Sequence, residues 1–204
     1  MKKNNHYRIK IARMIKNAGE GHIPSAYSII DIISALYSSV LKFDSSNPEW
    51  EDRDYFVLSK GHGAAALYAV LEEYGFISEE DIKAKGTEWG ILGGHPDCTK
   101  VAGAEASTGS LGHGLVTAMG IALGLKIQGK SNKVFSVVGD GESNEGTVWE
   151  TALIAQNLNL GNLCLIIDKN SSIDQILKFF FYHFKHPLFA VSVISGFIDE
   201  VMVD

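Results

Sequence analysis

The chain has 204 residues, of which 46% are hydrophobic and 21% charged, and a formal net charge of -6. This length and apolar content allow one substantial core and favour a single globular domain. The negative charge leaves no basic surface for nucleic acid. The two cysteines, Cys98 and Cys164, show neither a disulfide framework nor a metal-ligand spacing. Because the first residues lack the apolar stretch of a signal peptide, we expect a cytoplasmic protein without a membrane partner.

Helices are predicted in the first part of the chain, where apolar residues recur every three or four positions. The first helix spans about residues 7–18, and the second is capped near Ser25 and ends near residue 41. The elements predicted next are a short strand at 55–58, a helix at 63–75, a charged peripheral helix at 77–85, glycine-rich loops over 86–114 and a helix rich in alanine and glycine at 115–127.

Two later apolar runs, 133–138 and 163–167, are short and rich in strand-forming residues, which is typical of buried strands in a parallel sheet. The segment between them, 147–160, has helical spacing and completes a β-α-β crossover of about 30 residues. Both strands then end at the edge where open α/β sheets bind ligands. The predicted fold class is therefore α/β, with a parallel sheet flanked by helices.

Polar residues follow both predicted strands. Asp140 lies within Gly139-Asp140-Gly141, and Asn170 comes thirty positions after Asp140. A carboxylate and a carboxamide are oxygen ligands that suit Mg²⁺ and leave coordination positions for a diphosphate. Gly141 has no Cβ to keep phosphates away, and the following helix offers free amides to an anion. A Gly-Asp-Gly triplet alone is more often a tight turn, so the metal hypothesis depends on the asparagine.

Several blocks in this order and spacing together resemble the amino-terminal half of a transketolase. The blocks are Gly19-Glu20-Gly21-His22, residues 58–63, 93–97, 107–114, 139–150 and 167–170. They lie within roughly residues 8–175, so residues 1–175 are interpreted as a transketolase-like diphosphate-binding domain. The fold implied by this resemblance is the diphosphate-binding domain of thiamine diphosphate enzymes.

The resemblance implies roles for the matching residues in metal and cofactor binding. Asp140 and the side chain of Asn170 would bind Mg²⁺ or another divalent cation, with the backbone carbonyl of Ser172 as a third protein ligand. The residues that would contact thiamine diphosphate are Gly141, Asn170, the turn formed by Gly109, Ser110 and Leu111, and His62.

The same resemblance implies that His22 and His95 face a sugar substrate and that Glu145 joins a proton network with a partner subunit. Histidine suits this work because its unperturbed pKa lies close to neutral pH. His22, His62 and His95 each lie in a loop marked by glycine or proline, where binding residues tend to occur.

The implied activity is transfer of a two-carbon ketol unit from a ketose, or its phosphate, to an aldose. Transketolases also have a pyrimidine-binding domain, which supplies the glutamate that activates the cofactor, and nothing in these 204 residues resembles it. The expected partner is therefore a carboxy-terminal transketolase subunit, in a hetero-oligomer that would be a heterotetramer.

Residues 176–204 depart from the resemblance and form an atypical aromatic-rich tail, with six of the ten phenylalanines. The apolar part of the tail is too short to span a membrane. We therefore expect a domain that is truncated or altered after about residue 175. One edge of the sheet is then exposed or covered only by the tail, which predicts weak folding and weak cofactor binding.

Two alternatives remain open on the sequence alone. A different thiamine diphosphate enzyme, such as a 1-deoxyxylulose 5-phosphate synthase or a dehydrogenase component, explains Asp140 and Asn170 but accounts less well for the histidine-containing blocks. An inactive fragment or binding module would have the motifs without a working site.

Overall fold

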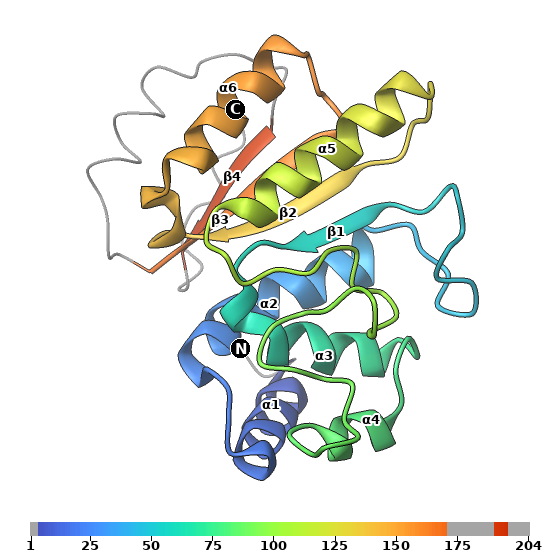
Figure 1. The fold of residues 1–204 in the computed structure, drawn as a ribbon, viewed down its shortest axis with the longest axis vertical. Coiled ribbons are helices and arrows are strands. Elements are labelled where there is room, and N and C mark those ends of the chain that lie inside the picture. Colours follow the sequence, from blue (N-terminus) through green and yellow to red (C-terminus); the bar gives the residue numbers. More distant parts are fainter. Residues whose placement is uncertain (1–3, 171–189, 196–204) are drawn as a thin grey trace. The chain divides into compact units, whose positions relative to one another are not determined.

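The computed structural model describes residues 4–170 and 190–195, and its chain divides into two compact units. We call them the helical unit and the sheet unit, after the elements that they contain (Figure 1). The helical unit comprises Met1–Asp54 and Lys60–Gly109, and the sheet unit comprises Tyr55–Ser59 and Ser110–Asp204. The boundary predicted near residue 175 lies outside the described residues.

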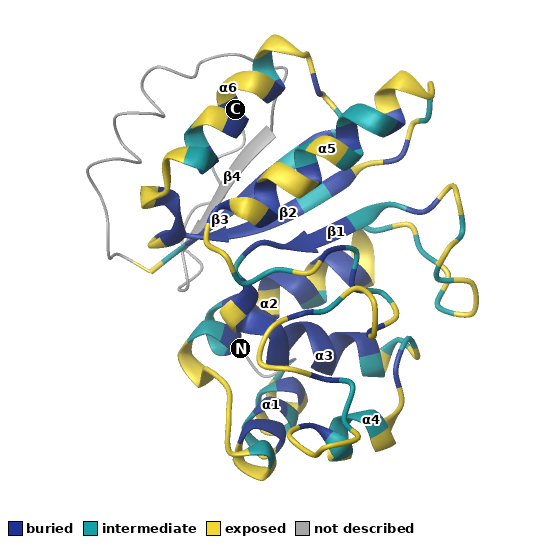
Figure 2. Cartoon of the chain, viewed as in Figure 1, coloured by how far each residue is buried: buried dark blue, intermediate teal, exposed yellow. Residues whose placement is uncertain are grey.

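The helical unit is organised around its most apolar helix. Its elements are α1 (Asn5–Ala18), α2 (Ile23–Ser39), the 3-10 turn η1 (Gly61–Gly63), α3 (Ala64–Glu73) and α4 (Glu79–Ala84). Every residue of α3 from Ala64 to Leu71 is buried (Figure 2), and α1, α2 and α4 all pack against this helix. A helix that is apolar on all sides must be enclosed, so α3 is the core of this unit.

The start of α2 differs from the predicted cap at Ser25. The N-cap is His22, whose Nδ1 accepts a hydrogen bond from the backbone N–H of Ser25 at 3.1 Å. An unprotonated imidazole nitrogen satisfies one of the free amides of the first turn, as a hydroxyl would. The preceding helix, α1, ends at Gly19 in the left-handed conformation, which glycine adopts without steric cost. The loop from Gly19 to His22 is thus fixed at both of its ends.

The sheet unit has four parallel strands among the described residues, in the order β1-β2-β3-β4. The strands are β1 (Tyr55–Leu58), β2 (Val134–Gly139), β3 (Leu163–Lys169) and β4 (Ala190–Ser195). The parallel sheet, the crossover and the bounds of the first strand were all predicted from the sequence, and the structure confirms them.

Helices α5 (His113–Ile127) and α6 (Gly146–Asn157) lie side by side on one face of the sheet (Figure 1). A buried cluster joins them to β2 and β3 and consists of Leu115, Val138, Val148, Leu165 and Ile167. Between β2 and α6 runs the 3-10 turn η2 (Glu142–Asn144). The packing of both helices therefore determines where the carboxyl ends of β2 and β3 lie.

The tail contributes to the sheet. Strand β4 lies within the apolar part of the tail and pairs with β3 from Cys164↔Ala190 to Lys169↔Ser195. Of the two expectations for this edge, exposure or coverage by the tail, the structure has the second. The covering segment is a regular parallel strand, and β-branched residues such as Val191 and Val193 favour strand structure. The aromatic run at 179–184 lies outside the described residues.

Candidate functional site

Asp140 follows β2 directly and is 6% exposed. Its Oδ1 accepts from the N–H of Gly141 at 2.8 Å, and its Oδ2 accepts from the N–H of Asn170 at 2.9 Å. Its own N–H donates to the carbonyl of Asp168 at 3.0 Å, which extends the pairing of β2 with β3. Asp140 and Asn170 therefore meet at one edge of the sheet, as predicted from the ends of the two strands.

Asp168, which the sequence analysis assigned no role, orients the side chain of Asn170. The Nδ2 of Asn170 donates to Asp168 Oδ2 at 3.2 Å, and Asp168 itself is fully buried in β3. Because a carboxylate oxygen accepts hydrogen bonds, the atom of the Asn170 amide that faces Asp168 is the nitrogen. The nitrogen is therefore directed toward the sheet. A fully buried carboxylate inside an apolar strand is rare unless it has partners, and the aspartate in that strand was the available signal.

Glu142 is a second residue without a role in the sequence analysis. It is 3% exposed, and its carboxylate accepts three hydrogen bonds. Oε1 accepts from Ser59 Oγ at 2.6 Å and from the N–H of Gly112 at 2.8 Å, and Oε2 accepts from the N–H of Gly139 at 3.1 Å. One buried side chain thus joins the ends of β1 and β2 to the start of α5.

The turn that precedes α5 contains two of the predicted cofactor contacts. The side chains of Ser110 and Leu111 are exposed. His113 Nδ1 lies 3.2 Å from Ser110 Oγ and 3.0 Å from the carbonyl oxygen of Leu111. Gly112 ends the turn with a φ of 80°, and a Cβ at this position would collide with Oγ1 of Thr147. Only glycine fits here, because both the backbone conformation and the space exclude a side chain.

Gly141 and Glu145 both face open space. Gly141 has φ -62°, so the backbone conformation does not require glycine, and an added Cβ would meet nothing within 4 Å. Space that the protein leaves unfilled beside a carboxylate fits the approach of a bulky anion such as a diphosphate. Glu145 is exposed at the N-cap of α6, and its side chain makes no capping hydrogen bond.

In the helical unit, three exposed imidazoles form a row. The ring centroids of His22 and His62 are 6.1 Å apart, and those of His62 and His95 are 4.9 Å apart, both with edge-to-face geometry. These are ordinary distances for packed aromatic rings. A Cβ on Gly61 would lie 3.0 Å from both His95 Cδ2 and the backbone nitrogen of Gly109. Gly61 and Gly109 therefore pack against the His95 ring.

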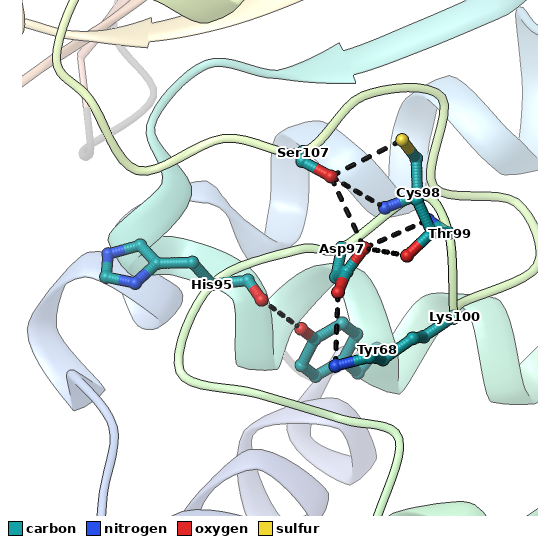
Figure 3. Close-up of polar contacts among 7 residues, drawn as sticks. All are labelled: Tyr68, His95, Asp97, Cys98, Thr99, Lys100 and Ser107. Atoms are coloured by element: carbon teal, nitrogen blue, oxygen red, sulfur yellow. Dashed lines mark hydrogen bonds and ion pairs between the residues drawn. The ribbon is translucent and has the colours of Figure 1, made fainter.

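The loop that carries His95 is held by its backbone (Figure 3). The buried hydroxyl of Tyr68 in α3 donates to the carbonyl oxygen of His95 at 2.9 Å. Two residues later, Asp97 accepts from the N–H and hydroxyl of Thr99 at 3.0 and 2.7 Å and pairs with Lys100 at 3.4 Å. The hydrogen bonds from Thr99 hold the pKa of Asp97 below its ordinary value. The ring of His95 points away from this network (Figure 3).

The loop that carries His22 is held by an ion pair. Lys85 Nζ lies 2.9 Å from Glu20 Oε1, and the lysine side chain is only 1% exposed whereas the glutamate is 53% exposed. An ammonium group is rarely buried without a partner. Glu20 is therefore the group that makes burial of Lys85 tolerable.

The predicted residues thus fall in both units. His22, His62, His95 and Gly109 belong to the helical unit, whereas Ser110, Leu111, Asp140, Gly141, Glu145 and Asn170 belong to the sheet unit. Ser172 lies outside the described residues. Within 4–170 and 190–195 there is no group of three or more His, Cys, Asp or Glu that could hold a metal. Metal binding by Asp140 and Asn170 stays a prediction, and two protein side chains would suit a cation that also binds water and phosphate.

The fold and the polar edge define a class of protein, an α/β protein whose parallel sheet has a carboxylate and a carboxamide where two of its strands end. A family model described as transketolase, thiamine diphosphate binding domain, matches residues 2–183, and the chain belongs to this family. None of the helices in the described part of the chain has the length and apolar character needed to cross a membrane.

Two curated relatives and one solved structure illustrate the relationship. The chain is 38% identical over 156 residues to a 6-deoxy-6-sulfo-D-fructose transketolase subunit of a Clostridium species, covering 76% of this chain and 57% of that protein. It is 39% identical over 163 residues to an apulose-4-phosphate transketolase subunit of Phocaeicola vulgatus, covering 80% and 58%. The chain thus spans somewhat more than half the length of these relatives.

Among solved structures, transketolase from Campylobacter jejuni superposes with a TM-score of 0.78 at 30% identity. The match covers 88% of this chain and 31% of that one. The family and the fold expected from the sequence blocks are therefore both confirmed.

Proposed function

We propose that this chain is the amino-terminal subunit of a thiamine diphosphate-dependent transketolase that works with a second polypeptide. It would transfer a two-carbon ketol unit from a ketose, or ketose phosphate, to an aldose or aldose phosphate. The observation that carries this proposal is the meeting of Asp140 and Asn170, whose 2.9 Å hydrogen bond joins two strand ends. The names of the relatives from Clostridium and Phocaeicola vulgatus support the reaction class.

In this proposal the sheet unit binds Mg²⁺ and the diphosphate. Asp140 supplies a carboxylate oxygen and Asn170 its amide oxygen, because the nitrogen of that amide already donates to Asp168. The carbonyl of Ser172 is proposed as a further ligand. Mg²⁺ prefers oxygen ligands and is usually shared with substrate phosphates, so one carboxylate suffices. Gly141 and the Ser110–Leu111 turn would contact the cofactor, together with Gly109 and His62.

When bound, thiamine diphosphate supplies the carbanion that this chemistry needs. The protein's own contribution would be positioning and proton handling. His22 and His95 expose imidazoles that can donate to a sugar oxygen on which negative charge develops. Glu145 is exposed at the start of α6 and would join a proton network with the partner.

The proposed partner is a chain with the pyrimidine-binding and carboxy-terminal domains of a transketolase. Both relatives, from Clostridium and from Phocaeicola vulgatus, are named as one subunit of a transketolase, which implies a second chain in each of those enzymes. A site completed by a second chain would make this protein inactive alone and active as a hetero-oligomer.

A reconstitution assay tests the proposal. The full chain is mixed with the candidate partner, thiamine diphosphate, Mg²⁺ and a panel of ketose donors and aldose acceptors, with and without phosphate groups. Mass spectrometry should detect an acceptor lengthened by two carbons only when both proteins and the cofactor are present. Formation of a stable complex that binds the cofactor but lengthens none of the acceptors would contradict the assigned reaction.

A further inference from the structure

The buried carboxylate of Glu142 forms hydrogen bonds at the carboxyl ends of β1 and β2 and at the start of α5. Its partners are Ser59 at 2.6 Å, Gly112 at 2.8 Å and Gly139 at 3.1 Å. Among the described residues these three partners are all neutral. The negative charge is therefore stabilised by converging O–H and N–H dipoles, and hydrogen bonds to an ionised acceptor are stronger than those between neutral groups.

Ser59 extends this network to the first turn of α5. The N-cap of α5 is Gly112, which has no side chain with which to cap the helix. Ser59 Oγ instead accepts from the N–H of Leu115 at 3.2 Å while it donates to Glu142. A Cβ on Gly114 would lie 2.5 Å from Ser59 Cα, so strand end and helix are in close contact. Because the hydroxyl hydrogen of Ser59 is donated to Glu142, an oxygen lone pair of Ser59 is directed at the N–H of Leu115 in the helix.

Both carboxylate oxygens of Glu142 act as hydrogen-bond acceptors, and the arrangement requires an acceptor at each of these two positions. Oε1 receives two donors and Oε2 receives the N–H of Gly139. A glutamine at this position could keep its oxygen toward Ser59 and Gly112, but its NH₂ group would then face another N–H. A buried donor without an acceptor is costly, so this amide would push Gly139 and the side chain apart.

Two of the three residues bonded to Glu142, Gly139 and Gly112, are adjacent in sequence to proposed metal or cofactor contacts. Gly139 immediately precedes Asp140, and Gly112 immediately follows the Ser110–Leu111 turn. We propose that Glu142 is a positioning residue, which keeps Asp140 and this turn in register for a bound metal diphosphate without contacting that ligand itself. This inference rests on the proposed function. Groups that hold metal ligands in place typically contribute 10–100-fold to affinity.

The test compares Glu142→Gln with a control of similar structural cost. Val134→Ala truncates a fully buried side chain at the amino end of β2, away from the ligand edge. Both variants of the full chain are titrated with thiamine diphosphate at saturating Mg²⁺. We expect Glu142→Gln to weaken binding about 10–100-fold, and Val134→Ala to change it by less than about 3-fold, although both lower the melting temperature.

A second measurement needs no ligand. Amide hydrogen exchange reports opening at single residues, so Glu142→Gln should accelerate exchange at Gly112 and Gly139 relative to the rest of the sheet unit, whereas Val134→Ala should not. If Glu142→Gln does not fold, Ser59→Ala replaces it. That variant keeps the carboxylate and removes one donor, and we expect a smaller loss of affinity with faster exchange at Gly112.

The outcomes separate this inference from the proposed function. Equal weakening of binding by Glu142→Gln and Val134→Ala would overturn the positioning role while leaving the proposed function intact. If the unmodified chain and its partner do not bind thiamine diphosphate, the proposed function is wrong. The exchange rates then decide whether Glu142 positions Gly112 and Gly139, because uniform acceleration in both variants would reduce it to an ordinary buried side chain.

Discussion

The two units differ in how their proposed site residues are held: Asp140 of the sheet unit is held at its side-chain oxygens, whereas in the helical unit His95 is held through its backbone carbonyl and His22 through one ring nitrogen. Asp140 is buried and both of its oxygens accept backbone N–H groups. His95, in contrast, is exposed, and the hydroxyl of Tyr68 donates a hydrogen bond to its backbone carbonyl. This difference fits the roles proposed for them, a rigid metal ligand for Asp140 and an accessible imidazole facing substrate for His95.

This difference teaches how the proposed roles divide. Groups that bind a cation must keep a fixed geometry, so buried neighbours such as Asp168 and Glu142 are needed. Groups proposed to face a substrate need a fixed backbone position and a side chain that stays accessible. Tyr68, Asp97 and the Lys85–Glu20 pair hold the loops that carry His95 and His22. Substitutions of the proposed metal ligands in the sheet unit should therefore weaken cofactor binding, whereas substitutions of the histidines in the helical unit should lower turnover.

The largest effect is expected at Asp140. Asp140→Ala removes the carboxylate and leaves two backbone N–H groups without their acceptor. We expect Mg²⁺-dependent binding of thiamine diphosphate to weaken by more than about 100-fold. Calorimetric titration at several Mg²⁺ concentrations measures this. Asp140→Asn is the matched control for shape, and unchanged binding by both variants in the presence of Mg²⁺ would refute the metal role.

His95→Ala should show the opposite pattern. We expect nearly unchanged cofactor affinity and a turnover reduced by about 100-fold, the usual size of a general acid-base contribution. The measurement is a turnover assay with the reconstituted pair beside the same titration. His6→Ala changes another exposed histidine, on α1, and serves as the control. A loss of binding equal to that of Asp140→Ala would break the division between the two units.

Glu20 should matter more for stability than its partner Lys85. Glu20→Ala leaves a buried ammonium without its carboxylate, so we expect the free energy of unfolding to fall by about 2 kcal/mol. Lys85→Met, which removes the buried charge, should cost only about 1 kcal/mol. Urea denaturation measures both. The exposed pair Lys83–Glu79 offers a control, because Lys83→Ala should leave the free energy of unfolding nearly unchanged. The reverse ranking of Glu20→Ala and Lys85→Met would contradict the role of this pair.

The smallest effect is expected from the loop after His95. Because hydrogen bonds from Thr99 lower the pKa of Asp97 below its ordinary value of 3.8, the ionised form stabilises the folded loop. This contribution is complete above that ordinary pKa and disappears as the pH falls through the lowered one. Amide exchange at Thr99 should therefore become faster in acid. Asp97→Asn should remove the pH dependence, and an identical acid response in that variant would exclude Asp97 as its source.

Local patterns predicted the elements that depend on nearby residues. The strand at Tyr55–Leu58 and the crossover between β2 and β3 could be predicted because hydrophobic periodicity and glycine breaks are local signals. The meeting of Asp140 and Asn170 followed from parallel topology alone. Family membership was predicted from several blocks together and is confirmed. The role of every individual site residue, including metal binding by Asp140 and Asn170, stays a prediction.

Contacts between distant residues could not be predicted in the same way. Glu142 meets Ser59, which is 83 positions away in the sequence, and no local pattern announces that contact. Capping of α2 by His22 was missed because hydroxyl and carboxamide caps are far commoner than imidazole caps. Strand β4 lies in the tail, where no strand was predicted, because its pairing with β3 is a contact between segments that are distant in sequence.

The most direct test of the central proposal is calorimetric titration of the full chain with thiamine diphosphate and Mg²⁺, first alone and then with the candidate partner subunit. We expect binding that requires Mg²⁺ and tightens when the partner is added, because a second chain would complete the site. Absence of binding both with and without the partner would contradict the assignment of this chain as a cofactor-binding transketolase subunit.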